Sequence, residues 1–162
     1  MDEQGEGHFS GHPEQSAKTA GKVLKRLTYD NETIDTVVRL IRYHDYRMET
    51  TMKSVRRAAS KIGRDIMWME FVVQYADVLS QSPQTIPEKL EKLDQCMEKY
   101  QEIEAKSQPL SVKDLAVNGR DLIRAGIAPG PGLGQKLSQL LDLVLEEPEL
   151  NTREQLLEKI KE

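Results

Sequence analysis

The sequence predicts an all-α protein, a multi-helix bundle followed by a small helical tail. Three observations predict this class. Apolar residues recur with helical spacing in every strongly patterned segment of the 162 residues. Glycine, proline and capping residues separate these segments where helices would begin and end. No segment shows the apolar–polar alternation that marks a half-buried strand.

The first two helices are predicted between Pro13 and His44. Pro13 suits the first turn of a helix. Asp30 or Asn31 can cap the second helix, which runs to about His44. Four apolar residues fall on one side of the first helix, namely Ala17, Ala20, Leu24 and Leu27. The stripe expected to be buried in the second helix is Ile34, Val37, Val38 and Ile41.

Three further helices complete the predicted bundle. One spans about residues 51–62 and is ended by Gly63. The next, over about 65–80, is apolar around much of its girth, which predicts the central helix. After the break SQSPQTIP, residues 88–105 form a long, charged and more exposed helix that could bridge two subunits.

The tail is predicted from its capping residues. Ser111 and Asp114 have capping-box spacing, and Asn118 can cap a short helix that ends at Gly126. After a glycine–proline loop, a helix begins at Gly132 or Leu133 and runs to Leu145, and Asn151 with Glu154 caps the last helix.

Composition indicates an ordinary cytoplasmic protein. The chain is 38% hydrophobic and 31% charged, with no apolar run long enough to cross a membrane. The acidic N-terminus MDEQGEGHFSG is the reverse of a secretory signal. The single cysteine, Cys96, lies at an apolar helix position, which predicts a core residue and no disulfide.

The net charge of −4 conceals an asymmetry along the chain. Residues 39–64 contain eight basic and two acidic residues, whereas residues 142–162 contain seven acidic and three basic ones. Opposite charge on different segments predicts a directional surface.

The basic residues of the third helix share one side. At ~100° per residue, they lie within about 80° of Lys53, opposite the apolar side. Like charges one turn apart repel, so a stripe without acids calls for an anionic partner. The interpretation is contact with a phosphate backbone, and a merely solvated face is the alternative. The predicted contacts are Lys53, Arg56, Arg57 and Lys61, supported by Arg39 and Arg42.

The loop APGPGLGQK has two possible roles. Its spacing does not fit a nucleotide-binding P-loop, and no strand precedes it. Glycines allow a close backbone approach, and the helix that begins there offers unpaired N–H groups to one phosphate, with Lys136 in the first turn. The alternative is a hairpin between helices, and both can hold together. The predicted contacts are Gly130, Gly132, Gly134 and Lys136.

A metal site receives little support from the sequence. The candidate ligands are His12, His44 and Asp77, although histidines near helix ends are more often caps or surface residues. No cofactor and no catalytic residue is predicted for this chain.

Several phrases resemble bacterial CCA-adding tRNA nucleotidyltransferases and their poly(A)-polymerase-like relatives. FSGHPEQSA with LKRLTYDNETIDTVVRLIRYHD, and then VRRAASKIGRD with YADVLSQ, resemble the second half of their HD-superfamily region. LAVNGRDLI followed by GIAPGPGLGQKL resembles their tail and is the most specific part. The resemblance covers nearly all of the chain from Phe9 onward.

The resemblance implies which part of such an enzyme is present. The Asp-x-Asp and glycine-rich motifs of the catalytic head, which would use Mg²⁺ with CTP or ATP, are not found, nor is the HD doublet that lies upstream of the F-x-G-H stretch. We expect a partial HD-like body over 1–82, a connecting helix over 83–106 and a tail over 107–162.

In the family, body and tail hold tRNA while the head adds nucleotides. The resemblance therefore implies an RNA-binding portion that is inactive alone, with tRNA or another structured RNA as its partner. Two alternatives remain open: an HD-type metal-dependent phosphohydrolase fragment, and a helical interaction or homodimerisation scaffold built on the apolar fourth helix.

Overall fold

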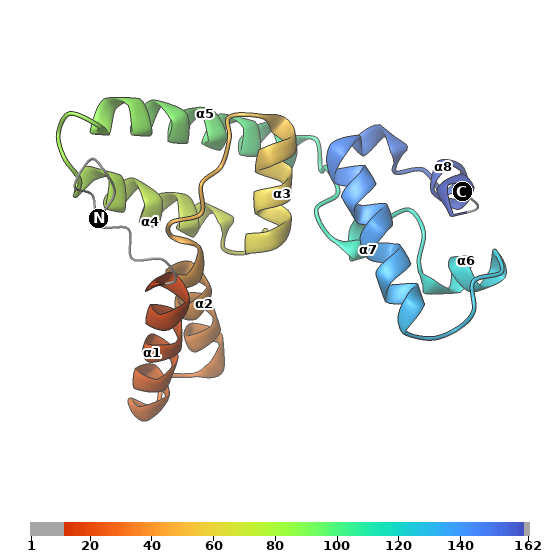
Figure 1. Ribbon diagram of the computed structural model, residues 1–162, viewed down its shortest axis with the longest axis horizontal. Coiled ribbons are helices and arrows are strands. Elements are labelled where there is room, and N and C mark those ends of the chain that lie inside the picture. Colours follow the sequence, from red (N-terminus) through yellow and green to blue (C-terminus); the bar gives the residue numbers. More distant parts are fainter. Residues whose placement is uncertain (1–11, 161–162) are drawn as a thin grey trace, which may run out of the picture. The chain divides into compact units, whose positions relative to one another are not determined.

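The computed structural model describes residues 12–160, and every regular element in that range is helical (Figure 1). The predicted all-α class is confirmed. The described residues form two compact units, each made of two segments of the chain. Unit 1 consists of residues 12–47 and 62–93, and unit 2 consists of residues 48–61 and 94–160.

Unit 1 begins with a helical hairpin formed by α1 (His12–Arg26) and α2 (Asn31–Tyr43), which lie side by side (Figure 1). Asp30 caps α2 as predicted, since its Oδ1 accepts a hydrogen bond from the backbone N–H of Thr33 at 2.8 Å. The cap fixes the point at which the chain turns back along α1.

The predicted burial of the α2 stripe is wrong. No residue of α2 is buried, because the hairpin covers only part of its apolar side. The four residues of that stripe, Ile34, Val37, Val38 and Ile41, are half-buried.

The sequence predicts α4 (Met67–Leu79) as the central helix, but the structure buries only one of its sides. One side contains the buried residues Met67, Glu70, Phe71 and Gln74. The other side is apolar and exposed, with Trp68, Met69, Val72 and Leu79 on it. The helix therefore has two polar residues inside and large apolar residues outside.

The buried polar pair of α4 is held by hydrogen bonds within unit 1. The Gln74 amide donates to Oε1 of Glu70 at 3.2 Å and to the carbonyl oxygens of Tyr43 and Tyr46 at 3.4 Å each. These bonds join α4 to the end of α2 and to the segment that follows it. Oε2 of Glu70 is buried without a hydrogen-bond partner among the described residues.

Helix α3 (Met52–Ile62) contributes residues 52–61 to unit 2. Its apolar side is buried as predicted, with Val55, Ala58 and Ala59 fully covered. Gly63 follows with φ +108°, so the predicted glycine stop is confirmed. The long α5 (Ile86–Ala105) begins in unit 1 and ends in unit 2.

The tail elements of unit 2 are short and capped. They are η1 (Val112–Asp114), α6 (Gly119–Arg124), α7 (Pro131–Glu146), η2 (Pro148–Leu150) and α8 (Arg153–Lys159). The caps at Ser111 and Asn118 are confirmed, each with a carboxylate three residues later that accepts from the backbone N–H of the capping residue.

The cap of α8 differs from the prediction by one residue. Thr152, and not Asn151, accepts from the N–H of Gln155. The Asn151 side chain accepts from Ala116 N at 2.8 Å and donates to Asp114 O at 2.9 Å. Asn151 thereby provides hydrogen-bond partners for backbone groups at the end of η1 and just after it. Sequence spacing cannot reveal this role.

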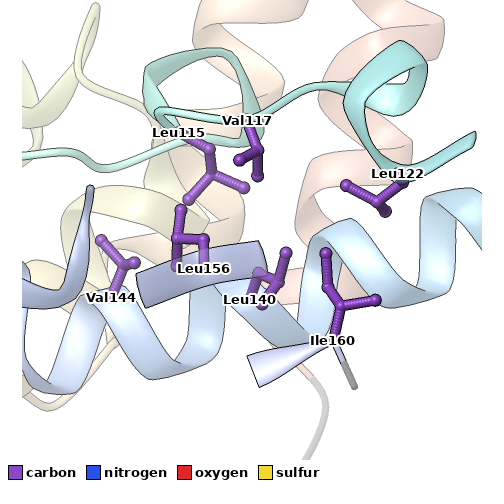
Figure 2. Packing of buried hydrophobic residues seen from close by; sticks show 7 residues of the cluster. All are labelled: Leu115, Val117, Leu122, Leu140, Val144, Leu156 and Ile160. Atoms are coloured by element: carbon purple, nitrogen blue, oxygen red, sulfur yellow. The ribbon is translucent and has the colours of Figure 1, made fainter. Parts of the chain in front are cut away.

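The tail has an apolar core of its own (Figure 2). Two of its residues precede α6, and the others come from α6, α7 and the C-terminal helix with the residue that follows it. Half-buried leucines of α7 and α8 pack against this cluster. Its members are Leu115, Val117, Leu122, Leu140, Val144, Leu156 and Ile160.

None of the helices in residues 12–160 is long and apolar enough to cross a membrane.

Candidate nucleic-acid interface

The C-terminal end of α7 contacts the basic side of α3. The last carbonyl groups of a helix lack partners within it and carry partial negative charge. No basic residue occupies the last turn of α7, and Glu146 ends the helix. Cations that stabilise this end must therefore come from another element, and they come from α3.

Arg56 satisfies the α7 carbonyl groups directly. Its Nε donates to the carbonyl oxygen of Leu145 at 2.7 Å and its Nη2 to that of Glu146 at 2.8 Å. Its Nη1 donates to Gln108 Oε1 at 3.3 Å. Burial lowers the pKa of Arg56, and the charge of Glu149 opposes that shift.

Arg56 is predicted to contact phosphate, which requires an exposed side chain, but the structure buries it. The residue is only 6% exposed and all three guanidinium nitrogens donate within unit 2. The sequence places it on the basic side of α3, but an arginine that caps a neighbouring helix fits that pattern equally well. We assign Arg56 to anchoring α3 against α7.

Lys53 and Arg57 lie one turn apart on α3 and share a carboxylate. Lys53 Nζ and Arg57 Nη2 each lie 2.7 Å from the same oxygen, Glu146 Oε1. The hydrogen bond from Lys53 is the main cause of the lowered pKa of Glu146, and the charges of Lys53 and Arg57 add to it. Glu146 is therefore an anionic partner for two of the basic residues on this side of α3.

The three side chains of this cluster remain partly open to solvent. Lys53 is 49% exposed, Arg57 46% and Glu146 39%. Lys61, two turns beyond Lys53 on the same side, is exposed as well. These cations extend along a helix that contains no acidic residue.

Arg39 and Arg42 lie in unit 1, where each binds a carboxylate. Arg39 forms a two-point contact with Asp65 at 2.7 and 2.8 Å and also donates to the carbonyl oxygen of Ile62 at 2.6 Å. This contact lowers the pKa of Asp65. Arg42 Nε donates to Glu14 at 3.0 Å and joins α2 to α1. Their contact with RNA stays a prediction.

The predicted phosphate loop lies between α6 and α7. Gly130 is the N-cap of α7, which begins at Pro131, one residue before the expected start. No side chain caps this end, and its first turn has no acidic residue. Lys136, half-buried, is near the same end of the helix. Unpaired N–H groups and the helix dipole both favour an anion at such an end.

The glycines of the loop differ in what the chain requires of them. Gly126 and Gly130 have φ values of +99° and +147°, which favour glycine. Gly132 and Gly134 are helical residues, and a Cβ at either would meet nothing within 4 Å. A helical glycine costs about 1 kcal/mol relative to alanine. Neither backbone conformation nor crowding within the chain explains why residues 132 and 134 are glycines.

Within residues 13–160, the candidate metal ligands His44 and Asp77 do not belong to a cluster of metal-binding side chains. Nδ1 of His44 is 2.7 Å from the carbonyl oxygen of Ile41, and Asp77 accepts from the Gln81 amide at 2.7 Å. The side chain of His12 lies outside the described residues. Within residues 13–160, no three His, Cys, Asp or Glu side chains are arranged to hold a metal ion. Cys96 is buried as predicted, and burial raises its pKa.

Two residues of the α3–α7 contact were missed by sequence reasoning. Glu146 and Gln108 complete the partners of Lys53, Arg56 and Arg57. The sequence did contain a sign of this contact, because α7 ends with an acidic residue and has no basic residue in its last turn. A negative charge at the C-terminal end of a helix is unfavourable unless a cation binds there. Nothing in the sequence specified which helix supplies that cation.

Comparisons with known proteins address the family. A search of curated proteins and a search of solved structures gave no match. A family profile described as tRNA nucleotidyltransferase domain 2, putative, matches residues 9–160. That range includes both compact units and the loop before α7, and it agrees with the resemblance found in the sequence. This chain belongs to the family of tRNA nucleotidyltransferase domain 2.

Proposed function

We propose that this chain is the RNA-binding body and tail of a CCA-adding-type tRNA nucleotidyltransferase. The observation that carries the proposal is the exposed cationic side of α3, where Lys53, Arg57 and Lys61 extend along a helix without acids. The family description supports tRNA as the RNA. Recognition would rest on shape and phosphate contact, as is usual for double-stranded RNA.

The beginning of α7 supports a second phosphate contact in unit 2. Its uncapped N–H groups, its lack of an acid and the unexplained glycines at 132 and 134 suit close approach of an RNA backbone. Lys136 supplies the charge. Arg56 is excluded from the proposed interface because its donors already bind carbonyl and amide oxygens.

Binding of tRNA to the full chain across a salt series tests the proposal. We expect the logarithm of the binding constant to fall linearly with the logarithm of salt concentration, because phosphate contacts release counterions. Changing Lys53, Arg57 and Lys61 together to glutamine should weaken binding roughly tenfold or more at low salt. Affinity that does not depend on salt would overturn the proposal.

A matched control removes three cations that have acidic partners one turn away. Lys18, Lys92 and Lys106 pair with Glu14, Glu88 and Glu102 respectively. Changing these three to glutamine alters net charge equally and should weaken binding much less. Equal losses for the two triple variants would show that net charge alone governs binding.

Gly132→Ala distinguishes the two roles of the loop. A methyl group at this position meets nothing in the chain, so the fold should be retained or slightly stabilised. Weaker binding of tRNA would support close approach of a phosphate. Unchanged binding would leave the loop as a hairpin between helices.

Homodimerisation stays a prediction that the exposed side of α4 makes testable. Trp68, Met69, Val72 and Leu79 are exposed there, and a second copy would have to cover them. Sedimentation velocity with and without tRNA would measure it. A monomer over the micromolar range in both conditions would count against this role.

A further inference from the structure

Two cations of α3 meet at a single oxygen atom. Lys53 Nζ and Arg57 Nη2 both lie 2.7 Å from Glu146 Oε1, so one anionic oxygen receives two charge-assisted hydrogen bonds. A non-bridging phosphate oxygen has the same charge sign and accepts the same donors. The pair is therefore already arranged for one phosphate of a nucleic-acid backbone.

The Glu146 side chain is not needed to hold α3 against α7. Arg56 does this through the backbone carbonyl oxygens of Leu145 and Glu146, which any residue at these positions would provide. An ion pair whose partners are about half exposed adds little stability. The carboxylate can consequently leave while the helices stay in place.

We propose that Lys53 and Arg57 form a two-point phosphate site that Glu146 occupies in the free protein, so that RNA must displace this carboxylate to bind. This inference rests on the proposed function. Within the same interface, the Glu146 carboxylate competes with the RNA phosphate. The phosphate takes the position of Oε1, and the Glu146 side chain turns outward into solvent. Glu147 and Glu149, exposed residues that follow along the chain, remain as repulsive charges in either state.

Substitution of Glu146 tests the competition in the full chain with tRNA as the probe. Glu146→Gln should raise affinity about two- to fivefold at low salt, because the competitor loses its charge. The slope of the log–log salt plot should stay close to that of the original chain, since Lys53 and Arg57 contact the same phosphate in both complexes. Lys53→Gln in the Glu146→Gln background should remove most of this gain.

The matched control is Glu147→Gln, which changes net charge equally at the neighbouring residue. A gain for Glu146→Gln that clearly exceeds the gain for Glu147→Gln supports the site. Equal gains would overturn it, because general charge repulsion would then explain both. Thermal unfolding should change little in either variant, given the Arg56 contacts.

Glu146→Asp provides a second variant that keeps the charge. The shorter side chain weakens the contact with Lys53 and Arg57, so competition predicts a smaller but measurable gain in affinity, whereas general repulsion predicts none. This variant decides the question if Glu146→Gln does not fold.

The two proposals fail in different ways. If the original chain binds tRNA with a steep salt dependence and Glu146→Gln resembles Glu147→Gln, only the competition is wrong. If neither the original chain nor any Glu146 variant binds RNA in a salt-dependent way, the proposed function fails and the competition fails with it. Binding by Glu146→Gln alone would support the competition most strongly.

Discussion

The inner side of α4 and the core of the tail are built from different side chains. Inside unit 1, α4 buries Glu70 and Gln74 beside Met67 and Phe71. In the tail, an apolar cluster (Figure 2) is accompanied by one buried acid, Asp121, whose two carboxylate oxygens accept from Asn118 N and from Arg153. The tail therefore buries an acid with partners for both oxygens, whereas α4 buries Glu70 with no partner for its Oε2 among the described residues.

The difference shows that burial follows hydrogen-bonding opportunity as well as hydropathy. The carbonyl groups of Tyr43, the last residue of α2, and of Tyr46 accept from Gln74, which also donates to Glu70. A buried polar side chain is tolerated when such partners exist and is costly without them. Burial raises the pKa of Glu70 to about 7, against the opposing effects of Gln74 and the charge of His44.

The largest expected effect is in the tail core. Leu140→Ala should lower the free energy of unfolding by about 2–5 kcal/mol, because it removes a fully packed side chain and leaves a cavity. Urea unfolding followed by circular dichroism measures this. Leu143→Ala, at an exposed position of the same helix, serves as the control. A loss below 1 kcal/mol for Leu140→Ala would refute the assignment of this cluster as the tail core.

Protonation of Glu70 should make stability depend on pH. Its folded pKa of about 7 is above the ordinary 4.5, so the folded state prefers the protonated form. Stability is then fully present below pH 4.5 and is lost as pH rises through 7, by up to about 3 kcal/mol. Glu70→Gln should abolish this loss and make the protein more stable at pH 8.

Thermal unfolding between pH 4 and 8 measures the effect of Glu70→Gln. The exposed Glu91 provides the control substitution, Glu91→Gln, and His44 is common to all three proteins. If the difference between Glu70→Gln and the original chain is the same at every pH, the raised pKa is wrong.

A smaller effect is expected at Asp121, the buried acid of the tail. Its Oδ2 accepts from the Asn118 N–H at 3.1 Å, and its Oδ1 accepts from Arg153 at 2.8 Å, which joins α6 to α8. Asp121→Ala should cost about 1–3 kcal/mol through the lost cap and ion pair. Asp121→Asn should retain part of the cap and lose less, as urea unfolding would show. Equal losses would indicate that the charge matters and the cap does not.

The smallest effect is expected on the outer side of α4. Val72 is 69% exposed, so Val72→Gln should change the stability of a monomer by less than about 0.5 kcal/mol. Urea unfolding at low protein concentration measures it. A loss above 1 kcal/mol would show that this side of α4 is covered in solution, and the contrast between α4 and the tail would then weaken.

Most helices could be predicted from the sequence because their signals are local. The caps at Asp30, Ser111 and Asn118 and the stop at Gly63 each depend on a few neighbouring residues. Asn151 shows the limit of this reasoning, since its hydrogen bonds reach Asp114 and Ala116 in a distant segment. A long-range partner leaves no mark in local spacing.

The candidate interface was only partly predictable for the same reason. Helical periodicity places Lys53, Arg56 and Arg57 on one side of α3, because that placement depends on the repeat of the helix alone. Periodicity does not say what faces that side. The adjacent Arg56 and Arg57 have the same charge and the same propensity, yet one caps a buried helix end and the other remains half exposed.

The sequence by itself determined that this protein is helical, where most of its helices begin and end, and that the basic residues of α3 share one side. Only the tertiary structure decided that Lys53 and Arg57 bind Glu146, that Arg56 is buried, and that α4 turns Glu70 and Gln74 inward. The physical reason is range. Helix formation and capping depend on residues within a few positions, whereas burial and charge pairing depend on groups that folding brings together from opposite parts of the chain.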